Sequence, residues 1–292
     1  MNINLQAHLL VFVATFLIAL SFIVSGKLSG VIDPISLTLC RFVIAVIVLA
    51  PFILLKTKFR INVKKSFSKG LKISLFYSLY FILLFKALED TTALNTATLF
   101  TLVPLLTAII SIFAFKQKLS IKKIFVYIIG IFGTSIVIFN GDLQLFIEFS
   151  LNKGDTLFFI AIISMALYSI SVKYFSTNDD IPLVLTFTTL LGGIFWMTLT
   201  LLFLDIPLEW DKLKGEYFYY ILYLSIAATL FTVFLYQKAT IIIGPNKVMA
   251  YVYINPVIVL IMNLFYDKEI SNIYVVLGCL ISSTATYFLL RK

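Results

Sequence analysis

Long apolar stretches separated by short polar breaks run through the whole chain, and they predict its secondary structure. A helix rises about 1.5 Å per residue and needs about 20 apolar residues to cross about 30 Å of hydrocarbon. Apolar runs of this length without in/out alternation fit helices rather than barrel strands. The pattern predicts ten spans, at residues 8–26, 34–55, 71–87, 93–115, 121–139, 156–175, 182–204, 217–237, 246–265 and 271–290.

The composition agrees with an integral membrane protein. Of the 292 residues, 61% are apolar and only 13% are charged, against about 25% charged residues in soluble domains. The mean hydropathy is +1.05. The first residues, "MNINLQAH", contain no Lys or Arg, and no small-residue cleavage site follows the first apolar run. We therefore expect the first span to be a retained helix rather than a signal peptide.

Basic residues are divided unequally between the two ends of the expected bundle. Seven lie in Lys56–Lys72, interpreted as a loop, and four in Lys116–Lys123; with the others on the same side they make fifteen, against six on the opposite side. The positive-inside rule then predicts a multi-pass protein of the cytoplasmic membrane with both termini cytoplasmic. The net charge of +9 sits beside helix ends, where it also attracts anionic lipid headgroups. We expect the lipid bilayer, and not nucleic acid, as its partner.

Two distant segments resemble each other. "TLVPLLTAIISIFAFKQKLS" spans Thr101–Ser120, and "YINPVIVLIMNLFYDKEIS" spans Tyr253–Ser271. Placing Pro104 on Pro256 gives an offset of 152 residues, which also aligns an Ile, a Phe and a Lys. The offset predicts an internal repeat, with units at residues 8–139 and 156–290 and a linker at 140–155.

Each unit holds five spans, so the second must insert upside down relative to the first. The charges agree: "KQKLSIKK" after the fourth span is strongly basic, whereas "DKEISN" after the ninth is net acidic. Inverted repeats of this kind are common in transporters.

The order of these motifs resembles the EamA-type transporters of the drug/metabolite transporter superfamily. The resemblance rests on "LFTLVPLLTAIISIFAFKQKLS", "YVYINPVIVLIMNLFYDKEIS", "DPISLTLCRFVIAVIVLAP", "FKALEDTTALNTATL" and "KGDTLFFIAIISMALYSISVKY". It implies an all-α integral membrane protein with ten transmembrane helices, arranged as two inverted five-helix repeats around a central cavity. Helices one, three, four, six, eight and nine would line that cavity. The Trp-Gly pair common in the family's first helix is Ala19-Leu20 here, so the resemblance names no substrate.

Polar side chains within the spans are the candidate substrate-binding groups, because such groups are costly in lipid and tend to face a bundle interior. On the fourth helix they recur every three residues, and on the ninth they form an i,i+4 pair. For each single hydroxyl, a bond to its own helix is the alternative. The expected binding residues are Asn95, Thr98, Thr101, Tyr80, Tyr168, Thr232, Tyr251, Asn255 and Arg41.

Arg41 and the two repeated prolines each have a structural alternative. Arg41 lies about 10 Å along the second helix, where snorkelling or a bond to backbone carbonyls competes with substrate contact. If Arg41 faces a cavity, we expect a substrate that carries a carboxylate or a phosphate group. Pro104 and Pro256 each free a carbonyl one turn earlier and are candidate hinges, or else static kinks.

Several kinds of chemistry lack the residues they need. No Asp or Glu lies in mid-span, the nearest being Glu89 and Asp90, so a uniporter or exchanger is expected rather than an ion-coupled carrier. Cys40 and Cys279 both fall within spans, which predicts neither a disulfide nor a metal cluster. His8 is the single histidine, and no paired carboxylates share a helix face in the membrane. We therefore expect no enzymatic activity, no metal and no cofactor.

These features predict an alternating-access transporter of a small polar or amphipathic metabolite, such as an amino acid or a related compound, acting in export. The alternatives are an importer or antiporter of a nucleotide-linked metabolite such as S-adenosylmethionine, or an exporter of drugs or cations. From other classes, a channel, a non-transporting membrane subunit and an intramembrane enzyme stay open. The oligomeric state is not encoded in any recognisable pattern.

Overall fold

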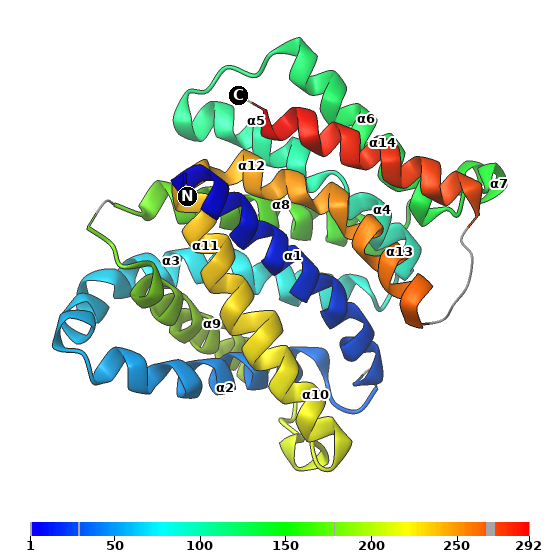
Figure 1. Cartoon of the computed structure of the whole chain (residues 1–292). Coiled ribbons are helices and arrows are strands. Elements are labelled where there is room, and N and C mark those ends of the chain that lie inside the picture. The colour runs from blue at the N-terminus through cyan, green and yellow to red at the C-terminus, as the bar shows by residue number, and fades with distance from the viewer. Residues whose placement is uncertain (1, 29, 178, 267–271, 292) are drawn as a thin grey trace.

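The computed structural model describes residues 2–28, 30–177, 179–266 and 272–291, and within them the chain is helical without strands. Figure 1 shows the helices packed side by side in one bundle. The α-helices of the first half are α1 Ile3–Lys27, α2 Pro34–Leu54, α3 Thr57–Ala87, α4 Ala93–Phe100, α5 Val103–Phe115, α6 Ile121–Ile138 and α7 Leu143–Ile147. The second half contains α8 Lys153–Phe175, α9 Pro182–Leu204, η1 Trp210–Lys212, α10 Glu216–Ser225, η2 Ile226–Phe231, α11 Thr232–Ile243, α12 Pro245–Ala250, η3 Tyr251–Ile254, α13 Asn255–Tyr266 and α14 Ile273–Leu290.

Nine helical stretches of the described residues are long and apolar enough to cross a membrane. The expected span that is not among these nine is the ninth, residues 246–265, which corresponds to α12, η3 and α13; the segment 267–271 that follows lies outside the described residues. The expectation that Lys56–Lys72 is a loop is wrong, because α3 begins at Thr57. This segment contains no proline, and Lys and Arg are good helix formers. The helix therefore extends towards the N-terminus beyond the apolar part of α3.

The fourth and ninth spans are each broken near the middle. The fourth consists of α4 and α5, separated by Thr101 and Leu102, with Pro104 in the first turn of α5. The ninth consists of α12, a 3-10 turn and α13, with Pro256 in the first turn of α13. Proline lacks the amide hydrogen that would continue the preceding helix, so both breaks have the same cause. The break corrects the expected continuous helix at 93–115 and the i,i+4 pairing of Tyr251 with Asn255.

Helix starts are fixed by local capping signals. Asp33 accepts hydrogen bonds from the amides of Ile35 and Ser36, with Pro34 in the first turn of α2. Asn152 and Asp155 form a reciprocal capping box at α8. Such caps satisfy amide hydrogens that have no partner within the helix. The capping box places the start of α8 three residues earlier than the apolar pattern indicated.

The two halves pack against each other in a paired manner. The third helix of the first half, α3, packs along α8, the first helix of the second half, and the C-terminal part of the eighth span, α11, packs along α1. The helices α2 and α9 also pack together, as do α6 and α14. At Gly70, a Cβ would lie 2.5 Å from Thr188 of α9. Small residues of this kind allow helix backbones to approach closely inside a membrane.

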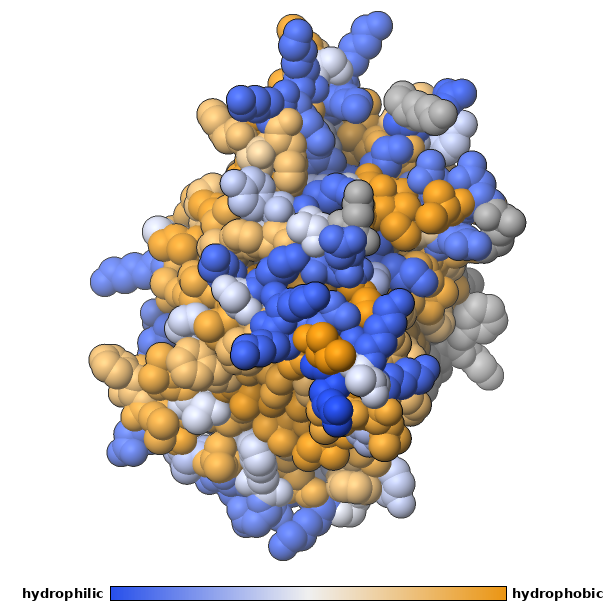
Figure 2. Space-filling view, turned by 90° about the vertical axis from the view of Figure 1, so that its left-hand side faces the viewer, coloured by the Kyte–Doolittle hydropathy of each residue, from blue (hydrophilic) through white to orange (hydrophobic). Residues whose placement is uncertain are grey.

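The bundle has two distinct ends. At the left of Figure 1 lie the α2–α3, α5–α6 and α8–α9 connections, and α7 lies at the opposite end. Figure 2 views the left end and shows hydrophilic side chains gathered over it, with hydrophobic side chains around them. We call the end with these three connections the connection end, and the opposite end the α7 end. The polar surface at the ends and the exposed apolar flanks, such as Phe203 at 89% and Phe113 at 81%, fit a protein surrounded by lipid.

Candidate functional site

Aromatic side chains of the two halves meet between α3 and α8. Tyr77 of α3 and Tyr168 of α8 are stacked with ring centroids 4.5 Å apart. Phe42 of α2 also stacks on Tyr77, at 5.8 Å, and Phe81 meets Tyr77 edge-on at 5.1 Å. The Tyr168 hydroxyl is buried and has no hydrogen-bond partner of good geometry among the described residues, although Gln237 lies close to it. This aromatic cluster contains Tyr168, which the sequence predicted as a binding residue, and Phe81, which it did not.

Arg41 extends from α2 into the same region. Its Nε donates a hydrogen bond to Thr229 Oγ1 at 3.0 Å, and its guanidinium carbon lies 5.9 Å from the Phe81 ring centroid. Thr229 belongs to the second half and is fully buried. The guanidinium is therefore directed towards the interface between the halves, and among the described residues its hydrogen bond is to the Thr229 side chain and not to a backbone carbonyl. An intramembrane charge held in the interior is a feature of substrate and ion pathways.

Thr229 lies in a π-helical segment, η2, between α10 and α11. The wider turn of a π-helix interrupts regular packing, and such segments occur frequently at functional sites. Thr232, the expected binding residue that follows, instead donates to the carbonyls of Ala228 and Thr229 at 2.9 and 3.2 Å. Tyr236, one turn further, shares a 3.2 Å hydrogen bond with Thr15 of α1. Nothing in the sequence pattern marked Thr229 as the Arg41 partner.

A second polar group that the sequence pattern did not single out lies between α9 and α11. Gln237 is fully buried, accepts a hydrogen bond from Thr186 at 3.0 Å, and donates one to Thr189 at 3.0 Å. The signal was present in the sequence, because Gln237 is an amide in an otherwise apolar stretch. Its two threonine partners are satisfied across the helix interface, which joins α9 and α11 without a charge.

Asn95 does not lie in the aromatic cluster. Its side-chain amide donates to Asp155 Oδ2 at 2.8 Å and to the Ser150 carbonyl at 3.2 Å. The Thr91 hydroxyl also donates to the Asp155 carboxylate. The backbone N–H of Asn152 donates to the same carboxylate, at 2.8 Å. We call this set, Thr91, Asn95, Asn152 and Asp155, the Asp155 network. It ties the start of α4 to the start of α8 near the α7 end.

The remaining expected binding residues are distributed over several sites. Thr101 donates to the Thr98 carbonyl at 2.7 Å, at the break between α4 and α5. Tyr80 packs with Phe81 and Phe100 beside the cluster. Tyr251 hydrogen-bonds His8 of α1 at 3.1 Å. Of these residues, Tyr80 contacts the cluster through Phe81, and the others make their hydrogen bonds elsewhere, so the expected residues do not form one continuous stripe.

The polar side chain of Asn255 lies at the break between η3 and α13. Its Oδ1 is buried without a hydrogen-bond partner among the described residues. A buried amide oxygen without a partner is uncommon. It remains available to a water or a solute, as the Tyr168 hydroxyl does.

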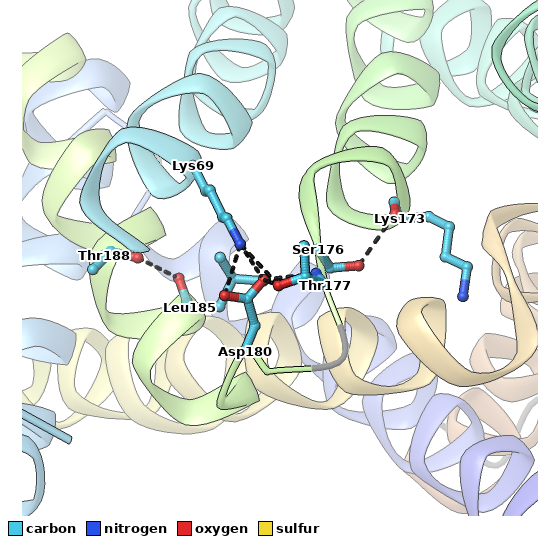
Figure 3. A network of polar contacts seen from close by, with 7 residues as sticks. All are labelled: Lys69, Lys173, Ser176, Thr177, Asp180, Leu185 and Thr188. Carbon is cyan, nitrogen blue, oxygen red and sulfur yellow. Dashed lines mark hydrogen bonds and ion pairs between the residues drawn. The ribbon is translucent and has the colours of Figure 1, made fainter. Parts of the chain in front are cut away.

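A polar network joins the halves at the connection end (Figure 3). Lys69 of α3 reaches the Asp180 carboxylate in the α8–α9 connection at 2.7 and 2.8 Å and the Thr177 hydroxyl at 3.1 Å. Thr177 in turn donates to Asp180 from its backbone amide at 2.7 Å. We call Lys69, Thr177 and Asp180 the Lys69 network. It connects the halves at the end opposite the Asp155 network.

The polar and aromatic groups between the halves define what this region can recognise. Among the described residues, no group of three or more His, Cys, Asp or Glu side chains is arranged to hold a metal ion. Within the described part of the chain, the region between the halves contains the Arg41 guanidinium, phenol and amide groups, and aromatic rings. Such an assembly recognises a small solute through hydrogen bonds and apolar contact.

An all-helical chain with these apolar spans, two equivalent broken helices and a polar interior shared by its halves defines a multi-pass membrane transport protein. The sequence profile of the EamA-like transporter family matches residues 5–139 and 152–291, one match for each half. The chain belongs to this family and is a membrane transporter of the drug/metabolite type.

Similar proteins agree with this assignment. The chain is 24% identical over 207 residues to the "Uncharacterized transporter YyaM" of Bacillus subtilis (strain 168), covering 69% of this chain and 68% of that protein. A solved crystal structure superposes with a TM-score of 0.76 at 17% identity, covering 96% of this chain and 94% of that one. At this identity the structural likeness supports the fold alone.

Proposed function

We propose that this protein is an alternating-access carrier that exports a small polar or amphipathic metabolite, an amino acid or a related compound, across the cytoplasmic membrane. The observation that carries the proposal is the convergence of Arg41 and Tyr77 from the first half with Tyr168 and Thr229 from the second. A binding site shared by two halves changes its access when the halves move relative to each other.

The broken helices support this mechanism. One break lies at Thr101 and Leu102 and the other at Tyr251–Ile254, the corresponding positions of the two matched segments. Discontinuous helices at equivalent positions of two repeats are a recurring feature of carriers. In this proposal the repeats are inverted, and Pro104 and Pro256 mark the points at which the helices bend during the cycle.

Uniport or exchange is the mode we propose. Asp155 is buried, with 1% exposure, but its carboxylate already accepts hydrogen bonds from Thr91, Asn95 and Asn152 at the start of α8. None of the aromatic cluster residues carries a carboxylate that could bind a coupling proton or sodium ion. Counterflow should therefore proceed without an imposed ion gradient.

A ligand screen followed by flux tests the function directly. Purified protein in detergent is heated with amino acids, their methylated derivatives, nucleotides, organic anions and hydrophobic cations, and each stabilising compound is tested for counterflow in proteoliposomes. A transported ligand raises the apparent Tm, because it binds the folded state selectively. Saturable counterflow distinguishes a carrier from a channel. Folded protein that binds and exchanges none of these compounds would contradict the proposal.

Orientation is tested separately. With the connection end cytoplasmic, a reporter enzyme that works only in the cytoplasm should be active when fused after Lys292. A second fusion at the same position, carrying an enzyme that works only outside the cytoplasm, should stay silent. The reverse result would invert the orientation but would leave carrier function untouched.

A further inference from the structure

Arg41 holds a positive charge that no carboxylate neutralises among the described residues. The ion pairs found there join Lys69 with Asp180, Lys86 with Glu89 and Lys212 with Glu209. The Tyr77 phenol lies near the guanidinium and carries no charge at neutral pH. A charge in this position is costly inside a membrane unless a partner is supplied.

The guanidinium also has hydrogen-bond donors to spare. Arginine presents five N–H donors in a planar fork, and Thr229 engages the one on Nε. The terminal nitrogens donate no hydrogen bond to a described residue. Because Nε is anchored and Phe81 lies 5.9 Å away, the fork is held in place for a ligand. Two parallel N–H groups fit a carboxylate in a bidentate manner.

The surroundings of Arg41 define the rest of the ligand. Phe81 lies beside the fork, and it continues into the aromatic cluster through Tyr77 and Tyr168. The Tyr168 hydroxyl is buried without a partner of good geometry. Arg41 is the single basic residue of α2, and the aromatic cluster contributes no basic side chain. A single fork matches a single negative charge, whereas a phosphate dianion calls for further cationic donors.

We infer, on the basis of the transport function proposed above, that the carried solute bears one carboxylate group, as an organic monoanion or a zwitterionic amino acid does. This carboxylate binds Arg41, and the apolar part of the solute lies against Tyr77, Tyr168 and Phe81. Arg41 is then the residue that determines substrate charge. Thr229 is a positioning residue, since it acts on the solute through Arg41.

The first test uses wild-type protein and needs no variant. Two matched pairs of probes differ in the carboxylate: 3-phenylpropanoate with 3-phenylpropanamide, and phenylalanine with phenylalaninamide. The inference expects each carboxylate to raise the apparent Tm and to support counterflow, with its amide binding at least tenfold more weakly. Phosphate and phenyl phosphate are included, and tighter binding of the phosphate ester than of the carboxylates would overturn the choice of a carboxylate.

The second test uses variants with a matched control. Arg41→Gln removes the charge, Arg41→Lys keeps the charge but removes the fork, and Arg60→Gln removes an exposed charge at the connection end. We expect tenfold or weaker carboxylate binding in both Arg41 variants, with Arg41→Lys retaining more affinity than Arg41→Gln, and unchanged binding in Arg60→Gln. Ligand-free Tm values establish that each variant is folded, and the wild-type probe pairs decide the question if Arg41→Gln is not.

Failure of the inference and failure of transport give different results. Compounds without a carboxylate that bind and exchange equally well in wild-type and Arg41→Lys protein would overturn the carboxylate assignment and leave a carrier. Folded wild-type protein that neither binds nor exchanges any compound would overturn both.

Discussion

The two polar networks that join the halves at opposite ends of the bundle differ in chemistry. The Asp155 network surrounds a carboxylate of 1% exposure with uncharged donors from Thr91, Asn95 and Asn152. The Lys69 network is an ion pair in which the lysine side chain is 27% exposed and the aspartate side chain 8%. A buried carboxylate with several hydrogen bonds is expensive to release, whereas a partly exposed ion pair contributes little.

This difference indicates which end opens at lower cost. When the halves separate at the connection end, the Lys69–Asp180 ion pair is broken and both charges become hydrated. Separation at the α7 end requires the start of α4 to leave a buried carboxylate. We therefore expect the carrier without ligand to open more readily at the connection end.

The largest effect is expected from Asp155→Ala. The substitution removes the acceptor of three hydrogen bonds and one partner of the α8 capping box, so we expect a loss of about 3 kcal/mol in the free energy of unfolding. The measurement is unfolding in mixed micelles of SDS and a mild detergent. Asp142→Ala is the control, since Asp142 also caps a helix start, that of α7, but is exposed. Equal losses in both variants would contradict the special role of the buried network.

Asn95→Ala should cost less, about 1–2 kcal/mol, because it removes one donor to Asp155 but leaves the carboxylate with two others. The same unfolding measurement applies. This variant also tests the prediction that Asn95 binds substrate. Weaker ligand binding without loss of stability in Asn95→Ala would support the prediction that Asn95 binds substrate, and would contradict its structural role in the Asp155 network.

Lys69→Gln should lower stability by at most about 1 kcal/mol, yet it should favour opening at the connection end. The reporter is a cysteine at Ser171, a buried residue of α8 with 4% exposure, in protein whose Cys40 and Cys279 are replaced by Ala. We expect maleimide to label it several-fold faster than in protein that retains Lys69. The exchanged pair Lys69→Asp with Asp180→Lys should restore slow labelling, and unchanged labelling in Lys69→Gln would show that this pair is not a gate.

The smallest effect is expected from salt. Raising NaCl from about 0.05 to 0.5 M shortens the screening length and should reduce the Lys69–Asp180 contribution by a few tenths of a kcal/mol. Labelling of the Ser171→Cys reporter should rise slightly in the presence of Lys69 and stay constant in Lys69→Gln. An equal salt response in both proteins would assign the effect to other surface charges.

The apolar pattern predicted the helical class and the approximate positions of the spans, because crossing lipid requires long runs of apolar residues. It failed at Lys56–Lys72, where polarity indicated a loop but helix propensity extends α3 from Thr57. The internal repeat located the segments that contain both helix breaks, because Pro104 and Pro256 leave a visible signal. The inverted arrangement of the halves and the hinge role of the prolines stay predictions.

The site was harder to predict from the sequence. Arg41 and Tyr168 were recognised as polar groups in apolar spans, and the structure places both at the interface of the halves. Asn95 was selected by the same rule but belongs to the Asp155 network. Spacing along one helix gives the face on which a side chain lies, but it does not tell which neighbouring helix that face meets.

The sequence by itself thus determined that the chain is a helical membrane protein with an internal repeat, since these properties depend on composition and on local periodicity. Only the tertiary structure decided that Arg41 meets Thr229 across the two halves, that η2 is a π-helix, and that Asp155 and Asp180 form polar contacts at opposite ends of the bundle. Asn95 and Asp155 are 60 positions apart in the chain, and Arg41 and Thr229 are 188 positions apart. Helix packing alone brings such residues together, because no local pattern specifies a partner at that separation.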